Sequence, residues 1–546
     1  MTAGDRVTAG DRSGGTPVAD LGRVHLIGVG GAGMSAIAAL LVARGLAVSG
    51  SDARDSAVVA ALRAAGVDVH VGHDAAHVDD VDTVVVSSAV RETNPELATA
   101  RARGARVLHR SAALAALMAD RRAVAVAGAH GKTTTSAMVS VALLAAGADP
   151  SYAIGGTVLA DLPDGATLGA PSSGPLAGAR HGAGEVFVAE ADESDASFLA
   201  YRPTVAVVTN VEPDHLDHYG TREAFEQAFR DFAERVVDGG ALVACADDAG
   251  SRALLAAAAR PLRARGARTV GYGQDAAADV VVGDFRVGPG AGSTFTLTTS
   301  HPDLAAAGEV LRTELTLAVP GIHNALNAAA AWTAARLLGA DPADLRRGLD
   351  AFRGTGRRFE HRGTAGGVRV VDNYDHHPTE VAALLRGARP VAAGGRVVVL
   401  FQPHLYSRTR IFATEFADAL ALADAVVVTD VYGAREDPDP DVSGATITDR
   451  MSDGAHGEFV ADRLAAARRV AELAAPGDLL LTVGAGDVTE LADVVLSHLT
   501  RLADGADDVH GTARPSVDRS AEPSADGSAA ASDERPADGA AGRSAS

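Results

Sequence analysis

Short runs rich in valine, isoleucine and alanine alternate along this chain with turns that contain glycine or aspartate and with stretches of helical periodicity. The apolar run at 24–29 precedes a glycine turn and an apolar helical stretch, and the run at 122–127 is followed by the same arrangement. Apolar strands that are each followed by a turn and a helix are typical of parallel sheets covered by helices. The pattern therefore predicts an α/β protein.

The alternation falls into three blocks, and we predict that each is a domain, because 546 residues exceed what a single hydrophobic core serves. The first block spans residues 23–119 and the second spans 120–350, which includes a glycine-rich, β-like stretch near 270–320. The third block spans 351–502 and shares with the first a doubly wound character. No short-period repeat is visible.

Composition narrows the class of protein. Residues 1–22 and 503–546 are rich in Gly, Ser, Ala, Asp and Pro without a hydrophobic period, which predicts disordered tails and no secretory signal. The apolar run at 137–146 is shorter than the roughly 20 residues that cross a bilayer, so we expect a cytoplasmic protein without membrane insertion. A net charge of −21 argues against nucleic-acid binding, and one cysteine, Cys245, excludes an internal disulfide.

The turn after the apolar run at 122–127 contains Lys132, the only lysine in the chain. A glycine turn between a strand and a helix cradles phosphates with its backbone N–H groups, and a lysine there reaches the terminal phosphates. The usual P-loop has a glycine where this chain has Val126, so the motif is the shorter G-x-x-G-K-T form. We predict ATP binding by the residues Gly128, Ala129, His130, Gly131, Lys132, Thr133 and Thr134.

A second glycine turn, with Gly28, Gly30 and Gly33 in the spacing G-x-G-x-x-G, follows the first apolar strand, and Asp52 follows the next strand. This arrangement is typical of a diphosphate bound at a helix N-terminus. It fits NAD, FAD or a nucleotide sugar equally well, and a plain tight turn is the alternative.

Acidic side chains follow two later strands of the second block. Glu190, Asp192, Glu193 and Asp195 come after one strand, and Asp214 and His215 come in the turn after the next. Strand ends beside a phosphate loop are where Mg²⁺ gains carboxylate ligands, so we predict a two-metal site. The alternative is a solvated acidic loop.

Further polar residues lie on one helix and in the third block. Asn324 and Asn327 share a helix face, which favours hydrogen bonds to a ligand, with helix capping by Asn324 as the alternative. The third-block candidates follow strands or the domain junction and are Arg357, Arg358, Asp372, Tyr374, His376, His377, His404, Arg408 and Arg410. Each of these residues alone could instead form a surface ion pair. Together they would balance the charge of a phosphate-rich site.

The motifs in this order, over about residues 22–500, resemble those of the Mur ligase family. The similar segments are "GVGGAGMS", "SSAVRETNPE", "GAHGKTTT", "EADESDASF", "EPDHLDHY", "PGIHNALNA", "GTGRRFE", "HHPTE", "FQPHLYSRT" and "VYGAREDP". The resemblance implies a Rossmann-like N-terminal domain for a UDP-sugar, a central P-loop ATPase-type parallel sheet domain for ATP and Mg²⁺, and a Rossmann-like C-terminal domain for an amino acid. The implied activity is joining L-alanine to the lactyl carboxylate of UDP-N-acetylmuramate in peptidoglycan precursor synthesis, by a monomer or weak homodimer.

The resemblance also implies roles for individual residues. The implied catalytic residues are Lys132, Glu190, His215, Arg358, His376 and Arg408. The implied UDP-sugar-binding residues are Gly28, Gly30, Gly31, Gly33, Asp52 and Ser87. Thr133 and Glu190 would hold one Mg²⁺ ion, and Glu190 with His215 a second. Asn324 and Asn327 would contact the nucleotide.

The chain also departs from the family pattern. It has Asn373 where a second acid is common, Asp375 where a small residue is common, and Leu405 where many members have arginine. No second lysine exists for the carbamylated bridge of some relatives, and Ser194 differs from the tyrosine of a sister ligase that attaches whole peptides. An NAD-dependent oxidoreductase, from the first glycine turn alone, and a catalytically silent nucleotide-binding regulator are the alternative functions.

Overall fold

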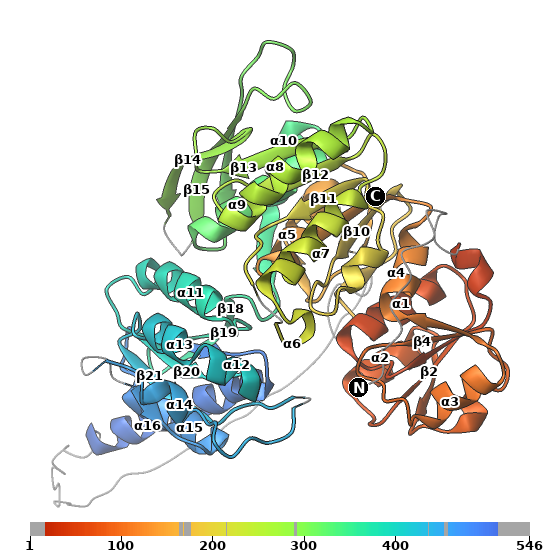
Figure 1. Ribbon diagram of the computed structural model, residues 1–546. Helices are drawn as coiled ribbons and strands as arrows, with labels where there is room; N and C mark the ends of the chain where they lie inside the picture. The colour runs from red at the N-terminus through yellow and green to blue at the C-terminus, as the bar shows by residue number, and fades with distance from the viewer. Residues whose placement is uncertain are drawn as a thin grey trace, which may run out of the picture.

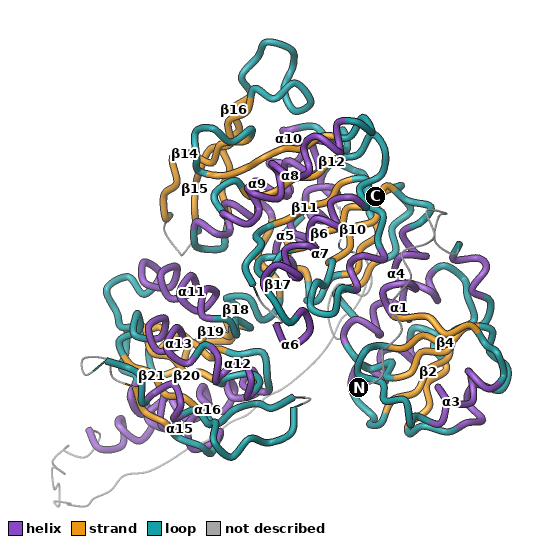
Figure 2. Tube along the Cα trace, viewed as in Figure 1, coloured by secondary structure: helices purple, strands orange, loops and turns teal. Residues whose placement is uncertain are grey.

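The computed structural model describes residues 17–162, 168, 176–213, 216–288, 292–434, 436–452 and 457–510. Within these residues the chain forms three lobes in sequence order, each built on its own sheet (Figure 1). In each lobe helices lie over the strands, as Figure 2 shows by secondary structure. The predicted α/β class with parallel sheets is confirmed.

The first lobe contains five parallel strands in the order β3-β2-β1-β4-β5. These strands are β1 Val24–Ile27, β2 Val48–Asp52, β3 Asp68–Val71, β4 Thr83–Val86 and β5 Arg106–His109. The helices are η1 Val18–Leu21, α1 Ala32–Ala43, α2 Ala57–Ala64, η2 Ala75–Val78, α3 Pro95–Ala102 and α4 Arg110–Met118. All four residues of β1 are buried, as a strand covered on both faces requires.

The central lobe contains a ten-stranded sheet in the order β16-β15-β14-β13-β12-β11-β6-β10-β7-β9. Its strands are β6 Arg122–Ala127, β7 Ser151–Ala153, β9 Ala179–Arg180, β10 Val186–Glu190, β11 Val205–Val208, β12 Ala241–Cys245, β13 Arg268–Gly273, β14 Val280–Val287, β15 Ser293–Thr299 and β16 Leu311–Leu317. The last three are antiparallel and extend the sheet at one edge, which confirms the β-like character expected near 270–320. A separate pair joins β8 Val158–Ala160 to β17 Phe352–Thr355.

Helices of the central lobe flank this sheet. They are α5 Lys132–Ala145, η3 Ser197–Ala200, α6 Leu216–Tyr219, α7 Arg222–Glu234, α8 Ala249–Arg263, α9 Ile322–Leu337 and α10 Pro342–Ala351. The core joins alternate residues of the strands to α5 and α9, and includes the fully buried Trp332. Cys245 lies buried at the end of β12, the small core residue that its apolar neighbours predict.

The third lobe has six strands in the order β18-β19-β23-β20-β21-β22, parallel except for the β18–β19 pair. Its strands are β18 Glu360–Ala365, β19 Val368–Asn373, β20 Val397–Phe401, β21 Ala425–Val428, β22 Gly457–Phe459 and β23 Leu479–Val483. Its helices are α11 Pro378–Val391, α12 Tyr406–Ile411, α13 Ala413–Leu420, α14 Ala445–Thr448, α15 Arg463–Leu473, η5 Asp487–Glu490 and α16 Leu491–His510.

The predicted tails differ from the structure at their inner ends. Helix α16 runs to His510 and so enters the segment 503–546, and η1 lies within the segment 1–22. The other residues of those segments, 1–16 and 511–546, lie outside the described residues. In the described part of the chain, no helix combines the length and the apolar character needed to span a bilayer.

The order of strands in the central sheet determines where the candidate site residues meet. Strand β6 lies between β10 and β11, and all three are parallel. Their carboxyl ends therefore meet at one edge, where ligands bind in open α/β sheets. The lysine loop follows β6 and the acidic segments follow β10 and β11, so the fold brings together three motifs that lie far apart in the sequence.

Candidate active site

The loop between β6 and α5 has the backbone geometry of a phosphate cradle. Gly128 and Gly131 adopt φ values of 136° and 82°, in the left-handed region that favours glycine. A Cβ atom on Gly131 would lie 2.7 Å from Oδ1 of Asn327, so the loop also has no space for a side chain there. Helix α5 begins at Lys132 without a side-chain cap, which leaves its first N–H groups facing the loop.

The Lys132 side chain folds back over this loop. Its Nζ donates to the carbonyl oxygens of Gly128 and Ala129, at 2.7 and 3.1 Å, and to Oε1 of Glu193 at 3.0 Å. Burial opposes the charged amine, but Glu193, Glu190 and Asp192 outweigh it and raise the pKa of Lys132. Burial also raises the pKa of Glu193 to about 7, although Lys132 counteracts it. The lysine is thus a fixed cation at the helix N-terminus.

Thr133 and Glu190 form an oxygen-rich corner beside the lysine. Oγ1 of Thr133 donates to Oε1 of Glu190 at 2.9 Å, and the backbone N–H of Gly155 donates to Oε2 at 2.7 Å. A hydroxyl and a carboxylate at this separation suit a hard cation such as Mg²⁺. The predicted third ligand, His215, and the neighbouring Asp214 lie outside the described residues.

The other two carboxylates of the acidic segment serve a different contact. Asp192 accepts a hydrogen bond from Nη2 of Arg110 at 2.6 Å, and Asp195 lies 3.5 Å from the same nitrogen. Ser88 donates to Asp195 at 2.6 Å. Because Arg110 and Ser88 belong to the first lobe, these carboxylates connect it to the central lobe. The sequence predicted the acidic cluster but not its arginine partner.

Asn324 and Asn327 lie together on α9, as predicted from their spacing. Nδ2 of Asn324 donates to the carbonyl of Pro320 at 2.7 Å, and Nδ2 of Asn327 donates to Oδ1 of Asn324 at 3.3 Å. The helix N-cap is Gly321, with φ 95°, so capping by Asn324 is not the reason for its presence. Both amides line a cavity of ≈ 210 Å³ with Gly131 and Thr134.

In the third lobe, Arg358 and His376 face the same region. Arg358 lies 2.9 Å from Oδ1 of Asp375 and 3.7 Å from Oε1 of Glu380. Nδ1–H of His376 donates to the carbonyl of Tyr374 at 3.1 Å, which leaves Nε2 with the lone pair. Burial, with Arg408 and His404 nearby, lowers the pKa of His376 to about 3, so this imidazole is neutral.

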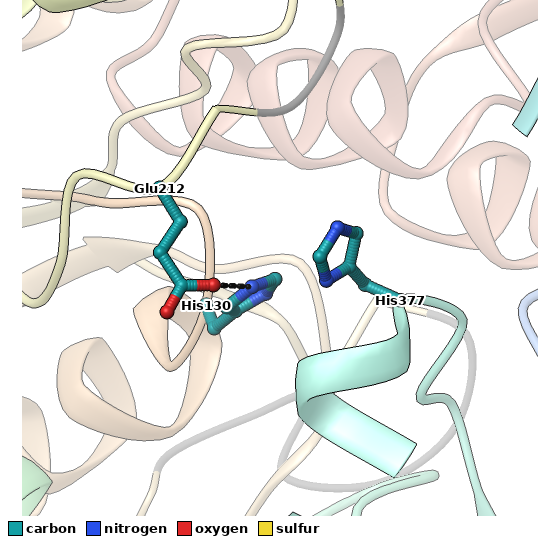
Figure 3. Close-up of side chains that lie close together, drawn as sticks. All are labelled: His130, Glu212 and His377. Carbon is teal, nitrogen blue, oxygen red and sulfur yellow. Dashed lines mark ion pairs between the residues drawn. The ribbon is translucent and has the colours of Figure 1, made fainter. Parts of the chain in front are cut away.

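Charged side chains join the lysine loop to the third lobe, and Figure 3 shows His130, Glu212 and His377 from this region. His130 has Nε2 3.3 Å from Glu212 and Nδ1 3.2 Å from Glu380 of α11. Although burial opposes its charge, these two carboxylates raise the pKa of His130 to about 10, and the His377 ring lies 4.8 Å away. His130, Glu212 and His377 are near enough to reach one ion, but carboxylates at both ring nitrogens favour a protonated imidazolium.

Glu380 was not singled out from the sequence. Its Oε2 accepts from the backbone N–H groups of His376 and His377 at 3.1 and 3.3 Å, while Oε1 faces His130. A glutamate at the third helical position after a capping residue is a recognisable capping box. Its second contact, across the lobe boundary, gives no sequence signal.

A cavity of ≈ 830 Å³ brings the candidates from all three lobes together. The candidate residues on its lining are Gly33, Ala129, His130, Gly131, Lys132, Thr133, Glu190, Asp192, Glu193, Arg357, Arg358, Tyr374, His376 and His377. The predicted UDP-sugar residues Gly28, Gly30, Gly31, Asp52 and Ser87 do not line this cavity or the smaller one. Arg408 also lies outside both linings, 5% exposed, but near enough to His376 to affect its pKa.

Sequence models of one family match all three lobes. The Mur ligase family catalytic domain matches residues 23–122, the Mur ligase middle domain matches 126–335, and the glutamate ligase domain matches 357–486. The chain belongs to the Mur ligase family. The chain is similar to a UDP-N-acetylmuramate–L-alanine ligase of Kineococcus radiotolerans, with 60% identity over 88% of this chain and 97% of the relative. The enzyme of that name from Saccharopolyspora erythraea is 54% identical over 88% and 94%.

Solved Mur ligase structures agree with this membership. A UDP-N-acetylmuramate-alanine ligase from Thermotoga maritima superposes with a TM-score of 0.69 and 29% identity, over 88% of this chain and 99% of that chain. A murein peptide ligase from Psychrobacter arcticus, 24% identical, shares the fold with a TM-score of 0.63 over 88% and 98%.

Proposed function

We propose that this Mur ligase joins L-alanine to the lactyl carboxylate of UDP-N-acetylmuramate at the expense of ATP. The observation that carries the proposal is the cavity lined by residues of all three lobes. Lys132, the Thr133–Glu190 pair, Arg358 and the neutral His376 all line it. The relatives named above, at 60% and 54% identity over most of both chains, support the choice of sugar and amino acid.

The reaction has two steps with different demands. First, an oxygen of the lactyl carboxylate attacks the γ-phosphorus of ATP, and the bond from that phosphorus to the β-phosphate oxygen breaks. The products of this step are ADP and the acyl phosphate of the sugar. Second, the amine of alanine attacks the acyl carbon, the tetrahedral intermediate expels phosphate, and the nitrogen loses a proton. Converting the carboxylate to an acyl phosphate supplies the leaving group that an amide bond requires.

The residues of the cavity suit the first step. A carboxylate and a triphosphate repel each other, so the site must supply positive charge where they meet. We assign this role to Lys132 with the free N–H groups of α5, and to Arg358 from the third lobe. Thr133 and Glu190 would hold Mg²⁺, which neutralises phosphate charge when bound. His215 remains a proposed second-ion ligand.

The second step would take place on the third-lobe side of the cavity. His376 carries an unprotonated Nε2, which can accept a hydrogen bond from the amine of alanine or take its proton. Arg408 would act near the alanine carboxylate or the acyl phosphate. Asn324 and Asn327 are proposed to contact the nucleotide from the smaller cavity, beside Gly131.

One assay tests the function directly. Purified protein with Mg²⁺ is expected to release ADP and phosphate only when ATP, UDP-N-acetylmuramate and L-alanine are all present, and mass spectrometry is expected to show the amide. Glycine and L-serine in place of alanine measure its selectivity. ATP hydrolysis independent of the sugar, or reduction of NAD, would contradict the proposal.

A further inference from the structure

The Arg358 guanidinium is enclosed by acidic and aromatic groups. Nη1 lies 2.9 Å from Oδ1 of Asp375 and 3.7 Å from Oε1 of Glu380, and the ring centroid of Tyr374 lies 5.3 Å from the guanidinium carbon. Arg358 lines both cavities, and Asp375 lines the smaller one. The side chain assigned to the phosphates is therefore already paired with a carboxylate.

A second carboxylate also faces this arginine. Asp375 and Glu380 both lie beside the Arg358 guanidinium, and Glu380 also faces the protonated His130. A polyphosphate brings several more negative charges into the same space. Since Asp375 is only 9% exposed, solvent weakens its repulsion of such a ligand less than it would at the surface.

Asp375 and Glu380 differ in their other contacts. Glu380 caps α11 through two backbone N–H groups and binds His130, so it has structural work apart from Arg358. The Asp375 carboxylate accepts a hydrogen bond from Nη1 of Arg358 at 2.9 Å and also interacts with the Asn373 side chain. Of the two acids, Asp375 is therefore the one whose removal leaves the cap of α11 and the His130 contact in place.

We propose that Asp375 competes with the phosphates of the nucleotide for Arg358 and so lowers the affinity of this enzyme for ATP. The inference rests on the proposed function only for the identity of the phosphate ligand. When the nucleotide binds, its phosphate oxygens replace the Asp375 oxygen on Nη1, and Asp375 loses its arginine partner.

The surroundings of Asp375 favour its protonation, which would release Arg358. Burial and Glu380 raise the pKa of Asp375 to about 6, against the opposing effects of Arg358, Asn373 and His130. Additional negative charge from a phosphate favours protonation of this carboxyl further. A protonated Asp375 no longer holds Arg358 as an ion pair, so the exchange ends with the arginine on the nucleotide.

Nucleotide titration of the full chain tests the competition. The Asp375→Asn variant keeps the size of the side chain but removes its charge, and Asp375→Ala removes the acceptor as well. The control is Asp493→Asn, which removes a carboxylate 3.0 Å from Arg362 in the same lobe, away from both cavities. Calorimetric dissociation constants are measured for adenosine, ADP and the analogue AMP-PNP with Mg²⁺, at pH 8.

We expect both Asp375 variants to bind AMP-PNP about threefold to tenfold more tightly than the wild type, as expected when one like charge is removed at short range. ADP binding should tighten less, and adenosine binding should not change. The Asp493→Asn control should match the wild type for all three probes. The gradient with phosphate number separates competition for Arg358 from a general change of the pocket.

Unchanged or weaker AMP-PNP binding in both variants would overturn the proposal, and weaker binding would mean that Asp375 positions Arg358 for the phosphates. Thermal melting identifies a variant that has lost its fold, and the other variant then decides. Neither the sugar nor alanine is needed, so a failed ligation assay leaves this test intact. A wild type that binds none of the probes would overturn both proposals.

Discussion

Two glycine loops join a strand to a helix in this protein, and they differ in how each is closed. In the first lobe Gly31 precedes α1 with φ −66° and ψ 144°, a conformation open to any residue. In the central lobe Gly131 precedes α5 with φ 82°, and Asn327 occupies the space where a side chain would lie. Other residues could adopt the backbone conformation of Gly31, whereas the conformation and surroundings of Gly131 require glycine.

The two loops also differ in charge. In the first, the backbone N–H of Gly30 donates to Oδ2 of Asp52 at 2.9 Å, so an acid of the same lobe already occupies a donor. In the second, Lys132 and Thr133 follow the glycine and face Glu193 and Glu190. Similar strand–loop–helix geometry thus gives a turn without a basic side chain in one lobe and a turn that carries a lysine in the other. The ligand of such a loop is decided by its side chains more than by its glycines.

The largest expected effect comes from the cation of the second loop. Lys132→Arg should lower kcat by more than about tenfold, because Nζ lies within 3.1 Å of three oxygens in a space too confined for a planar guanidinium. Steady-state ADP release measures this, with circular dichroism to verify the fold. Wild-type kinetics in this variant would mean that the charge alone matters and would remove the distinction between the loops.

A matched pair of substitutions tests the backbone difference. Gly131→Ala should weaken ADP binding about fivefold to tenfold and lower the melting temperature, because a left-handed alanine costs about 1–2 kcal/mol and its Cβ would meet Asn327. Gly31→Ala should leave the melting temperature almost unchanged, since its nearest neighbour would be the carbonyl of Gly28 at 3.4 Å. Equal losses of stability in the two variants would contradict this account.

A smaller effect is expected from the acid of the first loop. Asp52→Ala removes the acceptor of the Gly30 N–H and should raise the KM for the UDP-sugar about threefold to fivefold. The KM for ATP should stay at the wild-type value, because Asp52 lines neither cavity. A rise in the KM for ATP alone would show that the first loop serves the nucleotide instead.

The first lobe also contains a buried acid, and we expect it to contribute to stability. Glu96 is fully buried and meets Ser51, His73 and His77 at 2.6, 3.0 and 2.7 Å. Despite the opposing effect of burial, hydrogen bonds from His25, Ser51 and His77 lower its pKa from 4.5 to about 2.

Because the pKa of Glu96 is lower in the folded state than in the unfolded chain, its ionised form stabilises the fold by about 3 kcal/mol at any pH well above 4.5. This contribution disappears as the pH falls from 4.5 towards 2. Glu96→Gln should therefore melt several degrees below the wild type at pH 7, and the gap should narrow at pH 3. Melting curves at pH 7, 5 and 3 measure it. A gap that does not depend on pH would show that packing, not charge, is responsible.

Local signals predicted most of what this comparison uses. The three-block alternation gave the α/β lobes, and the G-x-x-G-K-T letters predicted a loop whose glycines adopt positive φ. The order of strands was needed to see why the acidic segments lie beside Lys132, and parallel pairing of β6 with β10 and β11 supplies the reason. These predictions depend on residues near in sequence or on a rule of sheet topology.

The contacts between lobes were not predictable in the same way. Nothing near Arg110 indicates that it binds Asp192, and nothing near Glu380 indicates that it faces His130, because each pair depends on how two separately folded lobes meet. Asp375 was visible as a departure, yet its pairing with Arg358 required coordinates. The roles of Arg408 and His215 stay predictions.

The enclosure of Lys132 has a practical consequence for experiments on this enzyme. No other side chain in the sequence carries a primary amine, so reductive methylation or an activated ester has a single side-chain target. The Lys132 side chain is 16% exposed and its amine is paired with Glu193, and a triphosphate in the cradle would cover it further. Bound nucleotide should therefore protect the Lys132 amine from the reagent. The loss of that one mass increment would report occupancy of the pocket without any engineered label.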